Sequence, residues 1–279
     1  MQIVTDSAAD IPPEQAAALN IRVVPLTIRF GDDEYVDGVD LTPQAFYDKM
    51  AELGTLPATA APSPGAFEVA FREAGAAGDP VVCINLSSAL SATMQSAQTA
   101  AKALAGEVDV RVVDSKSITA GEGMQVLAAA ELAATGASAD EVVALVEDLR
   151  GRTKVFGALD TLDNLKKGGR IGNAQALIGS MLSIKPLIDI STGSVEEAGK
   201  QRTRKKSLLW LRDKLFEMPD LPEVAVCHGC SGDVDDLIEL LLPRYPRERL
   251  KVWTIGPVIG THGGPRVIGL VWHDPKPEA

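Results

Sequence analysis

The chain has 279 residues, of which 46% are hydrophobic and 23% charged, an ordinary globular composition with enough core material for two modest domains or one large one. Its net charge of −11 disfavours nucleic acid as the main partner, because phosphate binding needs a basic face. No apolar run approaches the roughly 18 residues that span a bilayer, so we expect no stable membrane insertion.

The N-terminal half alternates strands with helices. Residues 1–7 predict a strand and not a signal peptide, because a basic flank and a long apolar segment are missing, and we expect a cytoplasmic protein. A hairpin is expected where 21–30 and 34–38 flank the turn "GDD". Residues 59–65 resemble a connector rich in Pro, Gly and Ser. The remaining strands are expected at 80–86 and 108–115, and the helices at 12–20, 41–53, 66–78, 119–136 and 138–152, with an alanine-rich helix after the serines that follow 80–86.

This alternation predicts a largely parallel sheet covered by helices on both faces. From about Lys154 the pattern changes, and segments 154–162, 185–191 and 194–202 predict strands of a different, smaller sheet, with the apolar helix 174–184 among them. The sequence therefore predicts an α/β protein with two domains: an N-terminal, largely parallel α/β/α domain at 1–153 and a smaller C-terminal α+β domain at 154–279.

Polar side chains follow three of the expected strands, at Thr5–Ser7, Asn85–Ser88 and Asp114–Ser117. Ligands of open parallel sheets bind outside the carboxyl ends of the strands, where helix N-termini and hydroxyl groups can donate hydrogen bonds to an anion. The turn after 80–86 is the richest, with hydroxyls from Ser87 to Ser96. Helix capping needs only one or two of them. The surplus predicts a site for a carboxylate or a phosphate.

Other motifs bear on which ligands and reactions this site could serve. The sequence has neither G-x-x-x-x-G-K-[ST] nor G-x-G-x-x-G, and it has no G-x-S-x-G around Ser91. The cysteines are Cys83, Cys227 and Cys230, and "CHGC" has no second ligand pair for zinc, so we interpret it as a strand end with two incidental thiols and expect no metal. His262 alone is compatible with a base, a hydrogen-bond donor or a structural role.

A series of ordered segments resembles the DegV family, the fatty-acid-binding proteins that serve bacterial fatty acid kinase. Examples are "TDS", "LSSALSATMQSA", "LDTLDNLKKGGRIG" and "IGPVIGTHGGP". The resemblance runs nearly end to end, through 5–7, 35–50, 59–65, 86–97, 113–124, 159–172, 183–188, 200–206 and 255–265.

The resemblance implies that one long-chain fatty acid, such as palmitate or oleate, is buried between the two domains, without a further cofactor. Its carboxylate is expected on Thr59 and Ser91, with Ser88 as a third candidate, although Ser88 is closer to the strand end and is also expected to be a capping residue. His262, Arg202 and Arg170 are expected in the head-group region or on the face that docks the kinase.

The resemblance also implies a carrier and not an enzyme. The protein would present the acyl carboxylate to a separate fatty acid kinase, which forms acyl phosphate for an acyltransferase. An acyl chain needs an apolar tunnel, and the helix 174–184 with Met181 is a candidate wall. The chain departs from the family pattern at Ala60, Ala61, Ala89 and Ala92, which replace polar residues or glycines, and at Gly263 and Arg266 in "GTHGGPR".

Two alternatives stay open from the residues alone. In the first, the protein is a hydrolase with Ser91 as nucleophile and His262 as base, oriented by Asp6 or Asp114. In the second, it carries a different small anion, such as a phosphosugar or a short acid. The basic stretch 199–206, with five Lys and Arg residues, is interpreted mainly as the solvated start of the helix 207–217.

Overall fold

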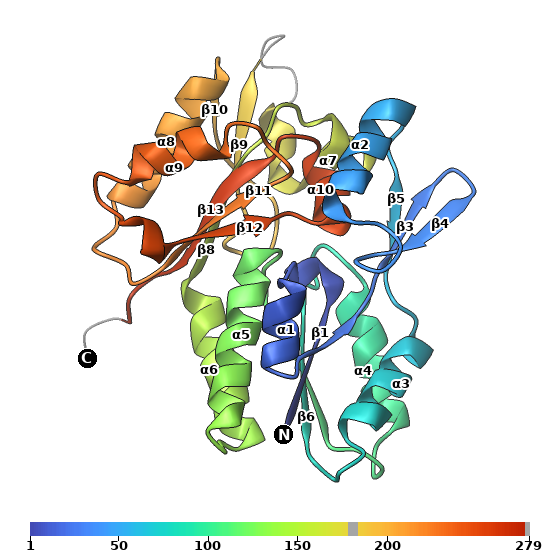
Figure 1. Ribbon diagram of the computed structural model, residues 1–279. Helices are drawn as coiled ribbons and strands as arrows, with labels where there is room; N and C mark the ends of the chain where they lie inside the picture. Colours follow the sequence, from blue (N-terminus) through green and yellow to red (C-terminus); the bar gives the residue numbers. More distant parts are fainter. Residues whose placement is uncertain (178–183, 277–279) are drawn as a thin grey trace.

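Four strands of the N-terminal half pair in parallel, as the alternation of strands and helices predicts. The computed structural model describes residues 1–177 and 184–276 (Figure 1). The strand order of this sheet is β2-β1-β6-β7, with β1 at Gln2–Asp6, β2 at Arg22–Val24, β6 at Val81–Asn85 and β7 at Val110–Asp114. Because every pair is parallel, the three polar strand ends lie at the same edge of the sheet.

Helices cover both faces of this sheet, which explains why its strands are continuously apolar. On one face, Ile3, Val82 and Ile84 pack against α5 (Ala120–Ala134) and α6 (Ala139–Arg152). On the other, Val4 and Cys83 pack against α3 (Pro64–Ala74) and α4 (Thr93–Ala103). The short elements η1 (Ser7–Ala9) and α1 (Pro13–Ala18) connect β1 to β2. The expected α/β/α arrangement is confirmed.

The segment 21–30, expected as one strand, is two strands in two sheets. Pro25 separates β2 from β3 (Thr27–Phe30), and a proline cannot donate to a sheet ladder. The strand β3 forms the expected hairpin with β4 (Asp33–Val36) and also pairs with β5 (Ala58–Ala60), which overlaps the start of the segment 59–65 expected to be a connector. The helix α2 (Pro43–Leu53) follows the hairpin and begins at its predicted cap, Thr42.

The residues from Thr153 onward form a mixed sheet of the order β10-β9-β8-β13-β11-β12. All pairs are antiparallel except β11 with β12. Its strands are β8 (Thr153–Ala158), β9 (Lys185–Asp189), β10 (Glu196–Gln201), β11 (Val224–His228), β12 (Leu250–Thr254) and β13 (Ile268–His273). The expectation of a smaller sheet is wrong, because this one has six strands against four. A domain boundary at 153/154 stays a prediction.

The helices of this half are α7 (Asp163–Lys167), α8 (Arg204–Phe216), α9 (Val234–Leu241) and α10 (Pro257–Gly263), with the 3-10 turns η2 (Gly172–Leu177) and η3 (Arg247–Arg249). Of these, α8 and α9 pack on one face of the six-stranded sheet through leucines such as Leu211 and Leu237. The expected apolar helix 174–184 starts inside η2, and the rest of it, with Met181, lies outside the described residues.

The other face of the six-stranded sheet looks toward the strand ends of the parallel sheet. Buried residues from both halves form one cluster there, for example Leu86 and Ile118 with Val155, Ile188 and Val271. Figure 1 shows the six-stranded sheet above the tips of β1 and β6, with α10 and α2 beside it. Across residues 1–177 and 184–276, we find no helix with the length and apolarity needed to cross a bilayer.

Candidate ligand-binding site

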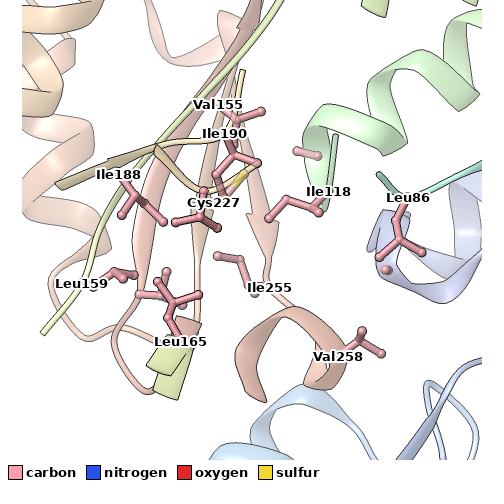
Figure 2. Packing of buried hydrophobic residues seen from close by; sticks show 14 of the residues in the cluster. Leu86, Ile118, Val155, Leu159, Leu165, Ile188, Ile190, Cys227, Ile255 and Val258 are labelled. Atoms are coloured by element: carbon pink, nitrogen blue, oxygen red, sulfur yellow. The ribbon is translucent and has the colours of Figure 1, made fainter. Parts of the chain in front are cut away.

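A cavity of about 180 Å³ lies within this shared cluster and is lined by residues from both halves of the chain. Most of its wall is apolar: Leu86, Leu159, Ile188, Ile190 and Ile255 all point into this region (Figure 2). Hydrophilic side chains line it at only a few positions, which are Thr59, Ser91, Thr119, Arg170 and His262. The parallel sheet contributes through the turns after β6 and β7, whereas Thr5–Ser7 after β1 does not line the cavity.

His262 and Thr59 come together at the cavity wall from distant parts of the chain. His262 lies on α10, and its Nε2 is 3.1 Å from Oγ1 of Thr59 on β5. Gly168 leaves room for the imidazole, because a Cβ there would lie 2.4 Å from Nδ1 of His262. Burial, aided by the nearby charge of Arg170, lowers the pKa of His262 to about 4. The imidazole is therefore neutral at pH 7.

The turn that carries Ser91 is held by backbone and side-chain hydrogen bonds. The Ser91 hydroxyl is 2.9 Å from that of Thr93, and the Ser91 amide donates to the carbonyl of Ser87. The Ser87 hydroxyl donates to the carbonyl of Gly193 at 2.6 Å, which ties the turn to the six-stranded half. The N-cap of α4, Ala92, has no side-chain cap, but the Ser91 hydroxyl accepts a hydrogen bond from the amide of Thr93, the first residue of α4, at 3.3 Å. Ser91 therefore helps to satisfy the start of the helix and also lines the cavity, whereas Ser87 bonds elsewhere.

Asp6 fixes the base of this turn. Its Oδ2 accepts hydrogen bonds from the Leu86 amide and the Asn85 side chain, both at 3.0 Å. The carboxyl is fully buried, and burial raises the pKa of Asp6 to about 6. Asp6 thus joins the ends of β1 and β6.

Ser88 is exposed and does not line the cavity. Its hydroxyl donates to Asp114 Oδ2 at 2.5 Å, and its amide contacts Oδ1 of the same carboxylate. The expectation that Ser88 caps the following helix is wrong, because it instead connects the ends of β6 and β7. Its role as a carboxylate ligand stays a prediction.

The three arginine positions differ in burial and contacts. Arg170 lines the cavity, and its guanidinium donates to the carbonyls of Leu90 (3.1 Å) and Gly168 (2.8 Å), so it links the end of α7 to the serine turn. Arg202 is exposed and does not line the cavity. Arg204, two residues further on, is half-buried and pairs with Asp233 at 2.7 Å.

The sequence gives no sign of the Arg204–Asp233 ion pair, because the two residues are 29 positions apart and form no local pattern. Arg266, where the family pattern has glycine, has a positive φ of 60°. Its carbonyl accepts a hydrogen bond from Arg204, and its guanidinium lies near Asp160 and Asp233. These contacts hold an arginine in a backbone conformation that favours glycine.

The side chains of the hydrolase alternative do not form a hydrogen-bonded triad. His262 Nε2 contacts Thr59, whereas Ser91 contacts Thr93. Asp6 is bound to the β6 strand end and Asp114 to Ser88. The described hydrogen bonds therefore leave Ser91 without a base.

Cys227 and Cys230 lie at the end of a strand, as the sequence predicts. Cys227 is the penultimate residue of β11, and Cys230 follows that strand. All three cysteines have free thiols. Cys227 also lines the cavity, and burial raises the pKa of its thiol. Among residues 1–177 and 184–276, no three His, Cys, Asp or Glu side chains are grouped so that they could hold a metal ion.

Comparison with known proteins gives a consistent result. The model of the DegV family, described as an uncharacterised protein family, matches residues 1–274. A DegV domain-containing protein of Clostridium perfringens is 35% identical over 272 residues, covering 94% of this chain and 93% of that protein. A Thermus thermophilus DegV family structure, described by its fatty acid binding, has a TM-score of 0.89 and 35% identity, covering 98% and 99% of the two chains.

A second solved structure, a stearic-acid-binding protein from Eubacterium ventriosum, has a TM-score of 0.86 and 28% identity, covering 97% of each chain. The relative and the two solved structures cover 94–98% of this chain, and the family model matches residues 1–274. The chain belongs to the DegV family.

Proposed function

We propose that the protein binds one long-chain fatty acid, such as palmitate or oleate, in the cavity, with its carboxylate at Thr59 and Ser91. The observation that carries this proposal is the lining: an apolar wall with three hydroxyls, an imidazole and a guanidinium, and no Asp or Glu among its described residues. A buried carboxylate needs such donors. Burial of an acyl chain contributes about 0.8 kcal/mol per methylene before ordering costs. The fatty-acid-binding relatives from Thermus and Eubacterium support the same ligand class.

The neutral imidazole of His262 suits this role. With a proton on Nε2, the ring donates to Oγ1 of Thr59, which leaves the Thr59 proton free to donate to a carboxylate. The Arg170 guanidinium, which also lines the cavity, adds a positive charge close to the same ligand group. The carboxylate would thus meet donors from β5 and from the serine turn, with a cation nearby.

The second part of the proposal is presentation. The protein holds the acid for a separate fatty acid kinase, which forms acyl phosphate for an acyltransferase, and it performs no chemistry itself. This exchange takes place in the cytoplasm, where the kinase has ATP. Arg202 is exposed, unlike the half-buried and ion-paired Arg204, so it is available to a docked kinase.

Organic extraction of the purified protein, followed by mass spectrometry, tests the binding step. We expect a C14 to C18 fatty acid in the extract. An empty protein, or one that carries only a phosphosugar or a short acid, would contradict the proposal.

A kinase assay tests the presentation step. With a bacterial fatty acid kinase and ATP, the loaded protein should yield acyl phosphate, and Arg202→Ala should slow its formation while fatty acid retention stays unchanged. Arg29→Ala, at an exposed arginine of β3, is the matched control. Equal rates in both variants and the wild type would remove Arg202 from the docking face.

A further inference from the structure

The cavity face of the six-stranded sheet lacks side-chain volume along one line. In β8, the alternation of a strand turns Val155 and Gly157 toward the cavity, followed by Leu159 just beyond the strand. Phe156 and Ala158 belong to the opposite cluster, under α8 and α9. Gly157, the middle one of these three cavity-facing positions, therefore places no side chain in the cavity.

The register of the sheet places other small residues beside Gly157. Gly157 pairs directly with Gly269 on β13, and Gly269 pairs with Cys227 on β11. All three residues line the cavity. They form a short row across three neighbouring strands, which we call the glycine trough. Its ends are bulkier, because Gly157 pairs with Ile188 on β9 and Cys227 with the buried Trp253 on β12.

Branched side chains border the glycine trough along both sides. Val155 and Val271 pair with each other on one side. Leu159 and Val267 lie two residues away from the glycines on the other side, and all four line the cavity. Because positions two apart on a strand are separated by roughly 7 Å, each border is about one side chain away from the floor.

One polar side chain lies beside the glycine trough. Thr119, at the N-terminus of α5, is 3% exposed and lines the same cavity. Its hydroxyl lies close to the buried carboxyl of Asp10 and to the thiol of Cys227, which belongs to the trough. The rest of the trough and its borders are apolar.

We propose that the acyl chain lies along the glycine trough and that Gly157 sets the longest chain that the protein accepts. This inference rests on the proposed fatty acid binding. The part of this row that lines the cavity, from Ile188 to Cys227, crosses three strand spacings, or roughly 14 Å, and Trp253 stands beyond its far end. A side chain at position 157 would stand in this path, one strand spacing from Ile188.

Gly157 is also the position where the test is practicable. Its φ is not positive, and a Cβ there would meet only Ile188 Cγ1, at 3.3 Å, and looser neighbours. A Cβ at Gly269 would lie 2.4 Å from the carbonyl oxygen of Phe156, so a substitution there would disturb the backbone. Gly157→Val fills the trough, and Gly157→Ala with Ile188→Val restores part of the space.

Binding titrations of delipidated protein with C12, C14, C16 and C18 acids measure the effect. We expect Gly157→Val to weaken C18 binding at least tenfold and C12 binding less than threefold, and the Gly157→Ala/Ile188→Val double variant to recover the long acids. Gly151→Ala, at a helical glycine with open space around it, should match the wild type. Equal losses for all lengths, or no loss, would overturn the proposal.

A labelling experiment on the wild-type protein decides the question even if Gly157→Val does not fold. Palmitate with a diazirine at the middle of its chain should, after irradiation, label peptides of β8, β11 or β13. Labels confined to other elements would overturn the path along the trough. A wild-type protein that retains no fatty acid would instead refute the proposed function, so the two failures are distinguishable.

Discussion

The two faces of the six-stranded sheet are built from alternate residues of the same strands and differ in packing. On the face under α8 and α9, Phe156 stacks on Trp272 with ring centroids 5.4 Å apart, and leucines such as Leu211 fill the remaining space. On the cavity face, the corresponding positions include Gly157 and Gly269. One face is a dense core, and the other leaves a cavity.

Neighbouring residues of one strand therefore have different roles: those on the packed face stabilise the fold, and those on the cavity face set the space for a ligand. Trp272 and Val271 are neighbours in β13, and both are about 1% exposed, but only Val271 lines the cavity. Dense packing makes each methylene on the first face costly to remove. On the second face, side chains act mainly by setting the space left for a ligand. Substitutions on the two faces should therefore have different consequences.

The largest expected effect is on the packed face. Trp272→Ala should reduce the free energy of unfolding by about 3–5 kcal/mol, because it leaves a cavity beside Phe156 and removes the indole hydrogen bond to Asp274. Val271→Ala, one residue away on the cavity face, should cost only about 1.5 kcal/mol. Chemical denaturation of the delipidated proteins measures both. Equal costs would mean that the two faces are equally packed.

The next effect concerns the polar part of the cavity. Thr59→Ala and Ser91→Ala should each weaken palmitate binding about 10- to 150-fold, as expected for the loss of one charge-assisted hydrogen bond of roughly 1.5–3 kcal/mol. The thermal stability of the delipidated protein should change little. Ser88→Ala is the control, because Ser88 contacts Asp114 outside the cavity. If Ser88→Ala loses affinity and Ser91→Ala does not, the two serines have the opposite roles.

The smallest effect is a pH dependence at His262. The pKa of this imidazole is about 4 in the folded protein and near 6.5 in an unfolded chain. Between these values the unfolded state binds more protons, so His262 contributes stability above pH 6.5 that is lost as the pH falls toward 4. For a partly exposed group this amounts to on the order of 1–2 kcal/mol. Denaturation of wild type and His262→Asn at pH 7 and pH 4.5 measures the difference.

Only the difference in stability between the wild type and His262→Asn isolates the contribution of His262, because other groups also titrate in this range. Asp6 and Asp37 have pKa values raised to about 6 by burial, so they bind protons in the folded state first and stabilise it as the pH falls through 6. His273, with a pKa lowered to about 4, acts in the same direction as His262. A difference between wild type and His262→Asn that does not change with pH would contradict a neutral, buried imidazole.

The sequence alone determined the parts of the fold that depend on neighbouring residues. Alternating strands and helices predicted the parallel sheet, because each element buries its own apolar face. Thr42 and Ser138 marked the starts of two helices, since a cap bonds to an amide only a few residues away. The polar strand ends were also predictable, because parallel strands place their carboxyl ends at one edge.

Only the tertiary structure decided which of these groups meet. Thr59 contacts His262 across 203 residues, and Ser88 bonds to Asp114 while Ser91 lines the cavity, although both serines belong to one turn. Gly157 faces Gly269 because of the register between β8 and β13, and a shift by one residue would turn Phe156 toward the cavity. Such pairings depend on the relative placement of distant segments, which no local pattern of residue types encodes.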